Sequence, residues 1–397
     1  MSFWTQNAVI YQIMIDRFAG FSPGARDDTM DWTGGTFRGI AEKVDYLTDL
    51  GVNVIWLSPF FKNAWYHGYE AIEFREPDPH FGTGQELKEL VDVLHGRGMR
   101  VLMDFVPNHC SDKNQFFQDA VSDEHSQYKQ WFYFENWPDE YLCYFDFKHM
   151  PKLNLDHPPA RDYMIGSAEY WMKDFGIDGF RLDHAPGPSD EFWKAFRQRT
   201  KAVNPESVMI GEVAIAGLPP KYVKTIMEDS VHDAVMAGRQ PDLSSNIPLM
   251  NEYAGIFDGA LDFNFYGQML RFAHGEAGLE EIKQRVEELY TQFPKKFLLP
   301  SFLDNHDKNR YLFETGQNYQ KLAEAAAFQF TLPQPPIIYY GTEVGMSHEK
   351  PILENSPQPG GDLPTRRKMN WNPDDRQKEL LEFYRQLIKK RASLGAP

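Results

Sequence analysis

Acidic, histidine and arginine side chains follow five short apolar runs of the sequence, at the points where these runs end. The five stretches span residues 104–109, 179–183, 211–212, 302–307 and 339–345. A parallel barrel places the carboxyl ends of its strands at one rim, so we expect these side chains to gather in one polar site. Paired carboxylates in such a site are typical of enzymes that cleave glycosidic bonds.

The stretch 176–183 and the residue at position 212 predict two carboxylates with different tasks. Strand alternation puts Arg181 and Asp183 on the same side of the chain. Arg181 beside Asp183 would keep that carboxylate ionised, as a nucleophile requires. Glu212 follows the next expected strand without a neighbouring cation in the sequence, which suits a general acid. A single acid at a strand end usually caps a helix or forms an ion pair, but several together favour a shared site.

Further polar residues follow the second, third and seventh expected strands. The run Asp-Asn-His-Asp occupies 304–307, and grouping such side chains at a rim is costly unless they meet a polyhydroxyl ligand or each other. Tyr69 comes after the second expected strand in the sequence, and His109 comes after the third. Each histidine taken alone is more often structural, so these residues gain weight only through their common placement.

The elements that would position these residues alternate regularly between strands and helices. The expected strands span 8–13, 52–57, 100–105, 178–182, 207–210, 257–261, 296–302 and 335–340. The expected helices span 36–49, 84–96, 161–175, 190–203, 278–293, 317–332 and 374–391. Eight strands in βα alternation predict an α/β fold, a closed (β/α)8 TIM barrel.

One long connection after the third strand interrupts this alternation. We expect residues 109–153 to form a small insertion subdomain, and residues 1–108 and 154–397 to form the catalytic barrel. The insertion is rich in Phe, Tyr and Trp, most of which would form its own core, while a few would offer flat faces to sugar rings. It also contains Cys110 and Cys143, for which two reduced thiols are favoured over a disulfide.

Composition and charge narrow the class of partner. The chain has 397 residues and a net charge of −16, which disfavours binding to nucleic acid and suits a neutral substrate. No apolar run reaches the roughly 18 residues of a membrane helix, so no membrane partner is expected. The first ten residues lack the pattern of a secretory signal, which predicts a cytoplasmic protein, with a mature secreted form as the alternative.

In order and spacing, several motifs resemble those of glycoside hydrolase family 13, the α-amylase family. The main ones are Asp104-Phe-Val-Pro-Asn-His109, Gly179-Phe-Arg-Leu-Asp183, Gly211-Glu212-Val213 and Phe302-Leu-Asp-Asn-His-Asp307, supported by His67-Gly-Tyr69. The stretch Met150-Pro-Lys-Leu-Asn154 resembles the version found in neopullulanases, cyclomaltodextrinases and maltogenic amylases. The matches run along nearly the whole chain.

The resemblance implies a role for each matching residue. Asp183 would be the nucleophile, Glu212 the general acid and then the base, and Asp307 the residue that stabilises the oxocarbenium-like transition state. The implied substrate contacts are Arg181, which orients the nucleophile, His109 and His306 on the same sugar ring, Tyr69 beneath it, and Asp362 with Arg366 on the next sugar. The implied reaction is hydrolysis of α-1,4-glucans or maltooligosaccharides with retention, for which the two carboxyl groups sit about 5–5.5 Å apart.

The sequence also departs from the family. Many α-amylases carry Lys-His where this chain has Pro186 and Gly187, and a calcium-binding Asp where it has Lys152. We therefore expect no required cofactor and no calcium at the family's usual site, despite Asn108. The acidic loop with Asp27, Asp28 and Asp31 is a weaker metal candidate and more typical of solvated surface. The family's C-terminal β-sandwich is expected to be absent after the last helix, 374–391.

Three alternatives to a retaining glycoside hydrolase can be weighed against the same residues. A transglycosylase or glucoside isomerase would use the same site with a sugar hydroxyl in place of water. A binding relative without activity would be expected to lose its acids, whereas Asp183, Glu212 and Asp307 are all present. A metal-dependent hydrolase would need a cluster of ligands with suitable spacing, which the sequence does not offer. The sequence leaves the oligomeric state open.

Overall fold

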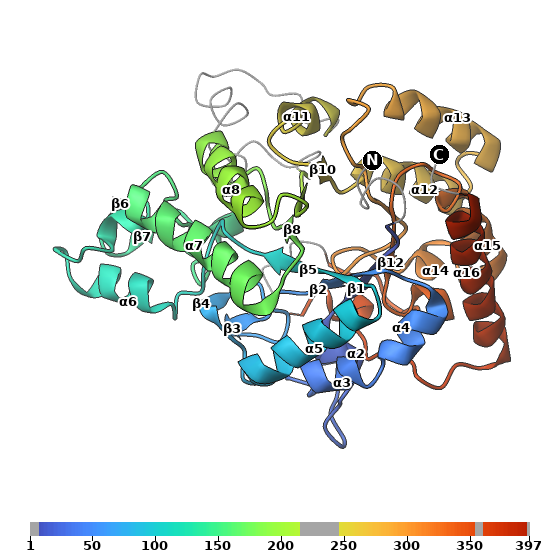
Figure 1. The fold of residues 1–397 in the computed structure, drawn as a ribbon, viewed down its shortest axis with the longest axis horizontal. Helices are drawn as coiled ribbons and strands as arrows, with labels where there is room; N and C mark the ends of the chain where they lie inside the picture. Colours follow the sequence, from blue (N-terminus) through green and yellow to red (C-terminus); the bar gives the residue numbers. More distant parts are fainter. Residues whose placement is uncertain (1–7, 215–245, 354–359, 395–397) are drawn as a thin grey trace. The chain divides into compact units, whose positions relative to one another are not determined.

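A computed structural model describes residues 8–214, 246–353 and 360–394 of the chain. Within it the chain forms two compact units. The first unit contains Met1–Ser58, His80–Leu102 and Gly259–Pro397, and the second contains Pro59–Pro79 and Met103–Asp258. Both are shown in Figure 1, coloured along the sequence.

Parallel strands form the centre of the first unit. β1 (Ile10–Ile13) pairs with β2 (Val54–Leu57) on one side and with β12 (Pro336–Tyr339) on the other, and β12 pairs with β11 (Ser301–Phe302). Each residue of β1 and β2 is buried, as expected for strands of a parallel sheet with both faces covered. Gln12 is the one polar residue in β1.

Amphipathic helices accompany these strands in the first unit. They are α2 (Ile15–Phe18), α3 (Phe37–Ala41), α4 (Val44–Leu50), α5 (Gly84–Gly96), α12 (Phe263–His274), α13 (Leu279–Tyr290), α14 (Tyr311–Glu314), α15 (Tyr319–Gln329) and α16 (Asp375–Leu394). α5 begins with a capping box, in which Thr83 and Glu86 each bond the other's backbone N–H. No helix in the described part of the chain combines the length and the apolar character that crossing a membrane requires.

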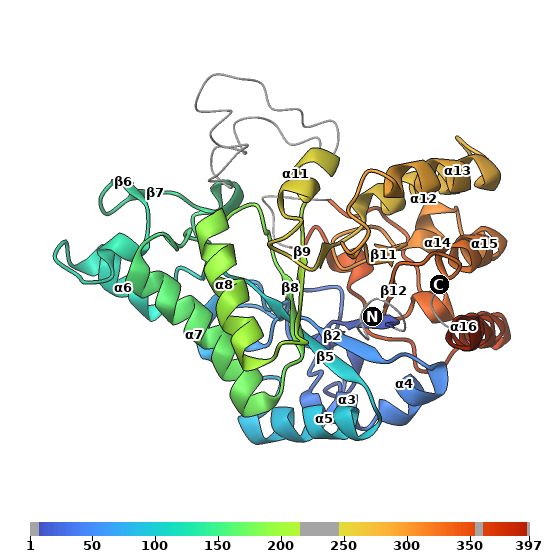
Figure 2. The same ribbon diagram turned by 45° about the horizontal axis from the view of Figure 1, so that its top comes forward.

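The second unit contains the strands that carry the predicted carboxylates. β8 (Gly179–Leu182) pairs with β9 (Val208–Gly211) in parallel, and both are fully buried. α7 (Pro158–Phe175) and α8 (Asp190–Val203) pack side by side next to them (Figure 2). The described part of this unit also contains two hairpins and four short helices: β3 (Phe61–Asn63) with β4 (Ala71–Pro77), β6 (Phe134–Asn136) with β7 (Glu140–Tyr141), α6 (Gln115–Ser122), α11 (Ile247–Glu252) and the 3-10 helices η1 (Lys129–Trp131) and η2 (Tyr144–Asp146).

Within the first unit the strand order is β2-β1-β12-β11, and within the second unit β8 lies next to β9. β5 spans Arg100–Phe105 and β10 spans Gly259–Ala260. The pairings described above are all parallel, and in both units they agree with the strands of the predicted (β/α)8 fold. The predicted fold class is therefore confirmed.

Several predicted elements differ in detail from those observed. The helix expected over 36–49 is two helices, because the chain breaks at Glu42 and Lys43. The connection after the third strand, expected to lack helices, contains α6, whose first turn is capped by the Asn114 side chain. α12 was not predicted, although its buried residues Phe265, Tyr266, Met269 and Phe272 have helical spacing and Asp262 caps it. The seventh strand, expected over 296–302, is only Ser301–Phe302.

The aromatic side chains of the insertion segment pack largely against one another. Phe117 contacts Phe132 and Tyr141 with ring centroids 4.9 Å apart in both cases, which agrees with the predicted mini-core. Cys110 and Cys143 are both buried and are not joined in a disulfide, as predicted. Burial raises the pKa of Cys110 well above its ordinary value, so this thiol is unreactive near neutral pH.

Candidate active site

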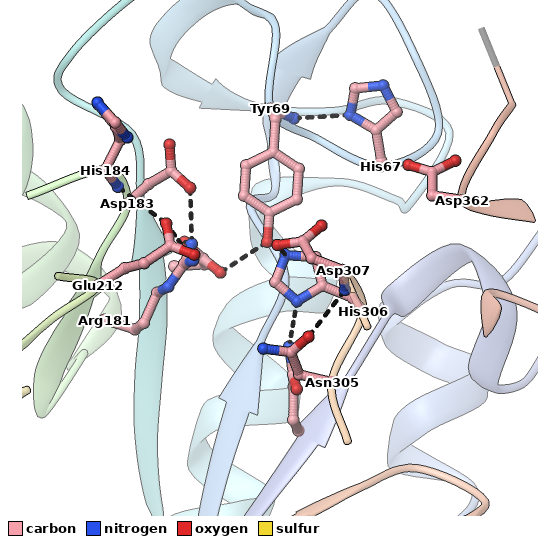
Figure 3. Close-up of polar contacts among 12 residues, drawn as sticks. His67, Tyr69, Arg181, Asp183, His184, Glu212, Asn305, His306, Asp307 and Asp362 are labelled. Carbon is pink, nitrogen blue, oxygen red and sulfur yellow. Dashed lines mark hydrogen bonds and ion pairs between the residues drawn. The ribbon is translucent and has the colours of Figure 1, made fainter. Parts of the chain in front are cut away.

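Arg181, at the centre of β8, contacts three carboxylates of the second unit. Its Nη1 atom donates to Oδ1 of Asp104 at 2.7 Å and to Oδ1 of Asp183 at 2.8 Å. Its Nη2 atom lies 2.8 Å from Oε2 of Glu212. Arg181 is only 1% exposed, so these contacts are shielded from bulk water. Figure 3 shows Arg181 between the side chains of Asp183 and Glu212.

Glu212 directly follows β9, and the backbone on both sides of Asp183 fixes its position. The Glu212 N–H donates to the Leu182 carbonyl at 2.9 Å, and the His184 N–H donates to Oε2 of Glu212 at 3.1 Å. His184 has a φ of 44°, which is uncommon for a residue other than glycine and turns its N–H toward this carboxylate. Glu212 has no cation beside it in the sequence, but in the structure Arg181 reaches it from the neighbouring strand.

The charge state of Arg181 is therefore firmly set. Burial alone would lower its pKa, but Asp104, Glu212, Tyr69 and Asp183 together raise that pKa well above the ordinary value. The guanidinium is thus a permanent positive charge shared by three acids. Asp104 accepts a hydrogen bond from Arg181 and so helps to hold this guanidinium in place.

Tyr69 reaches the same cluster from the loop between β3 and β4. Its hydroxyl donates to Oδ2 of Asp104 at 2.9 Å, and its ring centroid lies 5.9 Å from Cζ of Arg181. The preceding Gly68 has a φ of 90°, and a Cβ at that position would lie 2.1 Å from the Pro59 carbonyl oxygen. Glycine is therefore required for the tight turn that presents Tyr69.

His109 is buried behind Tyr69, and both of its ring nitrogens bond protein atoms. Nε2 donates to the Tyr69 carbonyl at 3.0 Å, and Nδ1 accepts from Nδ2 of Asn108 at 3.2 Å. The ring also stacks on Tyr144, with centroids 4.7 Å apart. Burial lowers the pKa of His109 to about 4, so the ring is neutral near pH 7. In this geometry the His109 ring bonds the Tyr69 backbone, so it supports Tyr69 rather than contacting a sugar directly.

The first unit contains a second polar cluster, centred on Arg366. Nη2 of Arg366 donates to Oδ1 of Asp307 at 2.7 Å, Nη1 lies 2.5 Å from Oδ2 of Asp362, and Nε donates to the His306 carbonyl at 2.7 Å. His306 places Nε2 3.0 Å from Oδ2 of Asp307. Arg366 is buried, whereas the side chains of Asp307 and Asp362 are 41% and 31% exposed, so their oxygens remain accessible to a ligand.

Two residues of this second cluster were not selected from the sequence as site residues. Asn305 accepts a hydrogen bond from the Asp307 N–H at 2.9 Å and so orders the loop (Figure 3). Gln12 places Nε2 2.8 Å from Nδ1 of His306, 294 residues away in the chain. A polar residue inside the apolar strand 8–13 was the available signal for Gln12, since such residues are buried only with a partner.

Comparison with known proteins agrees with this chemistry. Residues 12–385 match the family described as alpha amylase, catalytic domain. The chain belongs to the α-amylase family. The predicted resemblance to cyclomaltodextrinases is also confirmed, since a cyclomaltodextrinase of Geobacillus thermopakistaniensis is 34% identical over 97% of this chain and 62% of its own length.

Two further members of the α-amylase family resemble the chain along nearly its whole length. Alpha-amylase 2 of Dictyoglomus thermophilum is 37% identical over 98% of the chain and 64% of its own length. The crystal structure of an α-amylase from Geobacillus thermoleovorans, complexed with acarbose, superimposes with a TM-score of 0.77 and 29% identity over 98% of the chain and 79% of its own. The chain thus spans a little under two thirds of the length of the Dictyoglomus and Geobacillus thermopakistaniensis proteins.

The residues that the α-amylase family motifs predict fall into two sets, one in each unit. The second unit brings together Tyr69, His109, Arg181, Asp183 and Glu212, and the first brings together His306, Asp307, Asp362 and Arg366. Each set is organised around one buried arginine that contacts its acids.

The position where many α-amylases bind calcium carries different chemistry in this chain. Lys152 is 2% exposed and its ammonium lies 5.8 Å from the centre of the Tyr133 ring. Oδ1 of Asn108 is buried without a hydrogen bond from the described residues, and Gly187 packs so closely on it that a Cβ would lie 2.0 Å away. Across residues 8–214, 246–353 and 360–394, no three His, Cys, Asp or Glu side chains form a cluster that could hold a metal ion.

The acidic loop 27–31 engages its carboxylates with protein groups. Asp27 accepts from the Lys368 N–H at 2.7 Å, and Asp28 pairs with Arg26 at 2.7 Å. Oδ2 of Asp31 accepts from the Thr29 hydroxyl at 3.0 Å. These contacts hold the loop in place and already engage carboxylate oxygens that a cation would need as ligands.

Proposed function

We propose that the protein is a retaining α-glucoside hydrolase that acts on α-1,4-glucans or maltooligosaccharides. The observation that carries the proposal is the contact of one buried guanidinium, Arg181, with both Asp183 and Glu212. A shared cation aligns two carboxylates from adjacent strands toward one place. Two aligned carboxylates are what a double displacement at an anomeric carbon requires.

In the first step, Asp183 attacks the anomeric carbon while Glu212 protonates the glycosidic oxygen. The bond to the leaving sugar breaks, and a β-glucosyl ester forms on Asp183. Arg181 supports this step by stabilising the ionised form of the nucleophile, which is only 7% exposed. Asp183 loses its negative charge when this ester forms.

In the second step, Glu212 takes a proton from water, which attacks the same carbon and releases the sugar with its α configuration. Glu212 and Asp183 both contact the guanidinium of Arg181, so Glu212 stays beside the reacting centre in both steps. Once Asp183 is esterified, Arg181 and the His184 N–H still hold the Glu212 carboxylate in place to accept this proton. The same surroundings thereby support its change from acid to base.

Asp307 and its neighbours would hold the reacting sugar. We infer that Asp307 binds the 2- and 3-hydroxyls and stabilises the positive charge that develops on the ring. Arg366 supports this role by bonding Asp307 with one terminal nitrogen and Asp362 with the other, which links the reacting sugar to the next one. His306 would donate to the same ring from its position beside Asp307.

Tyr69 would form the platform beneath the ring, with His109 in support. The Tyr69 hydroxyl is held by Asp104 and its carbonyl by His109, so the ring has a fixed orientation. A rigid aromatic face suits the C–H face of a glucosyl unit. His109 contributes to sugar binding through Tyr69 in this proposal.

We also propose that no calcium is needed at the family's usual position in this chain. The support is the buried side chain of Lys152, whose backbone pairs with that of His109, together with the close packing of Gly187 on Asn108. An ammonium opposes a divalent cation, and Asn108 alone offers one neutral oxygen where calcium takes about six to eight.

A time course of products from maltooligosaccharides, cyclodextrin and pullulan tests the function. Cyclodextrin belongs in the set because one relative is named a cyclomaltodextrinase. The proposal expects shorter maltooligosaccharides that leave the enzyme as α anomers. Products longer than the input from maltoheptaose would instead identify a transglycosylase, for which the departures at Pro186 and Gly187 leave room. Failure to cleave any α-glucoside would reject the proposal.

A further inference from the structure

Gln12 is a buried amide whose side chain points from β1 to His306. It is 1% exposed, and in the described residues its side chain makes one hydrogen bond, from Nε2 to Nδ1 of His306 at 2.8 Å. Burying an amide costs free energy that an apolar side chain in the same strand would not cost. A buried amide with a single side-chain partner therefore indicates a task directed at that partner.

The chemistry of the neighbouring acid determines which nitrogen of His306 carries a proton. Nε2 lies 3.0 Å from Oδ2 of Asp307, and an ionised carboxylate only accepts hydrogen bonds, so Nε2 must be the protonated nitrogen. In the neutral ring Nδ1 is then an acceptor. The amide N–H of Gln12 satisfies it, and the opposite tautomer would lose both bonds.

We propose that Gln12 is a positioning residue that holds His306 as the neutral Nε2–H tautomer, with that proton directed at Asp307. The meaning of this for catalysis rests on the function proposed above, in which His306 and Asp307 bind the reacting sugar. The tautomer itself does not depend on that function. An imidazole held in this way donates at one fixed point and leaves the charge of Asp307 available for the transition state.

The backbone that carries Gln12 is held firmly on both sides. β1 lies between two parallel neighbours, with Gln12 opposite Trp56 on β2 and Tyr339 on β12. Its carbonyl also accepts from the Tyr340 N–H at 2.9 Å. The ring of Trp56 packs edge-on against His306, with centroids 6.2 Å apart. The position of the Gln12 amide is therefore fixed by its strand, and the His306 ring has to orient itself to that amide.

The second unit repeats the same arrangement independently. There Nδ2 of Asn108 bonds Nδ1 of His109, and Nε2 of His109 donates to the Tyr69 carbonyl. An amide on Nδ1 and an oxygen acceptor on Nε2 thus occur at both histidines of the predicted site. The recurrence supports a selected tautomer rather than a chance contact.

Gln329 provides a matched control for the loss of a buried amide. It is also 1% exposed in the first unit, but its Nε2 donates to two backbone carbonyls, those of Ser301 and Ile337. Gln329→Leu and Gln12→Leu both remove a buried amide that bonds through its Nε2 group. Only the second removes the partner of His306.

Imidazole ¹⁵N NMR on histidine-labelled protein near neutral pH tests the proposal directly. The His306→Asn variant identifies the signals of His306 among those of the 12 histidines. We expect a protonated shift at Nε2 and an unprotonated shift at Nδ1 in the wild-type protein and in Gln329→Leu. We expect Gln12→Leu to lose this pattern, and Gln12→Glu, whose carboxylate accepts only, to protonate Nδ1 as well.

Three results would overturn the proposal: an Nδ1–H tautomer in the wild type, a doubly protonated ring there, or an unchanged pattern in Gln12→Leu. Hydrolysis of an aryl α-glucoside gives the second reading. Gln12→Leu should lower kcat/KM about ten-fold, as for one lost hydrogen bond, and Gln329→Leu should lower it far less. If the wild type were inactive while its ¹⁵N pattern matched, the proposed function would fail and the assignment of Gln12 to His306 would stand.

Discussion

Nη2 of Arg181 lies 2.8 Å from Oε2 of Glu212, and Nη1 of the same guanidinium contacts Asp183. Arg181→Lys should therefore be severely impaired, because a single ammonium cannot bridge both carboxylates. Losing one charge-assisted bond costs about 1.5–3 kcal/mol, so we expect kcat/KM to fall by about 10- to 100-fold or more. Steady-state kinetics on maltooligosaccharides, with thermal unfolding recorded alongside, measures this.

Arg199→Lys is the matched control for that substitution. Arg199 also contacts two acids in the second unit, Glu169 at 2.7 Å and Asp162 at 3.0 Å, but it is partly exposed on the helices. Its replacement should change kcat/KM by less than about two-fold, because exposed ion pairs contribute little. Equal losses in the two variants would refute a special role for Arg181.

Glu212→Gln should separate the two tasks assigned to this residue. Gln cannot protonate a leaving sugar, so natural maltooligosaccharides should react orders of magnitude more slowly. A substrate whose leaving group needs no proton, such as an α-glucosyl fluoride, should lose far less in the first step. Burst kinetics with both substrates tests the difference. Losses of the same size on both would argue against the role of Glu212 as the acid.

Glu70 should make stability depend on pH. Burial, followed by the charge of Asp112, raises the pKa of Glu70 to about 8, from an ordinary 4.5. Because the folded pKa is raised, the unfolded chain releases this proton first as pH increases. The free energy of unfolding should then fall between about pH 4.5 and pH 8, by an amount on the order of 4 kcal/mol from this group.

Glu70→Gln keeps the shape of the side chain without the titration, so it should flatten this slope. Urea unfolding at several pH values measures the effect, with the exposed Glu135→Gln as control. The Glu70 variant should be more stable than the wild type above about pH 8. An unchanged slope would show that Glu70 is ionised in the folded protein at neutral pH.

Local signals account for the parts of the fold that were predicted well. α5 was predicted with its observed bounds, because the Thr83–Glu86 capping box and the spacing of Leu87, Leu90 and Leu94 are encoded within one segment. The hairpin of β3 and β4 was missed, since its bulged register does not give regular alternation. Elements whose pattern is interrupted depend on partners that the local sequence does not contain.

The same distinction applies to the candidate site. The motifs identified which acids to consider, but the contact of Arg181 with Glu212 joins two strands and was not foreseen from sequence neighbours. His109 was expected to contact the sugar. In the structure its ring is buried, and its Nε2 atom donates to the Tyr69 carbonyl. Gln12 and His306 are 294 residues apart in the chain, so only the folded structure reveals their hydrogen bond.

Removal of divalent cations should leave activity intact if the reasoning about Lys152 holds. Its buried ammonium stands where many α-amylases carry an acidic calcium ligand. After dialysis against EDTA, we expect unchanged kcat and a small change in thermal midpoint at most. A complete loss of activity that added calcium restores would show that the family's metal site is retained.

The central claim is that Asp183 forms a covalent bond to the sugar. Mass spectrometry of Glu212→Gln, quenched during reaction with an α-glucosyl fluoride, tests it most directly, since fluoride leaves without acid and the missing base slows release of the sugar. We predict one added glucosyl unit on the peptide that contains Asp183, and none in a second variant that also carries Asp183→Asn. An adduct on another residue, or a product released as the β anomer with no adduct, would contradict the account.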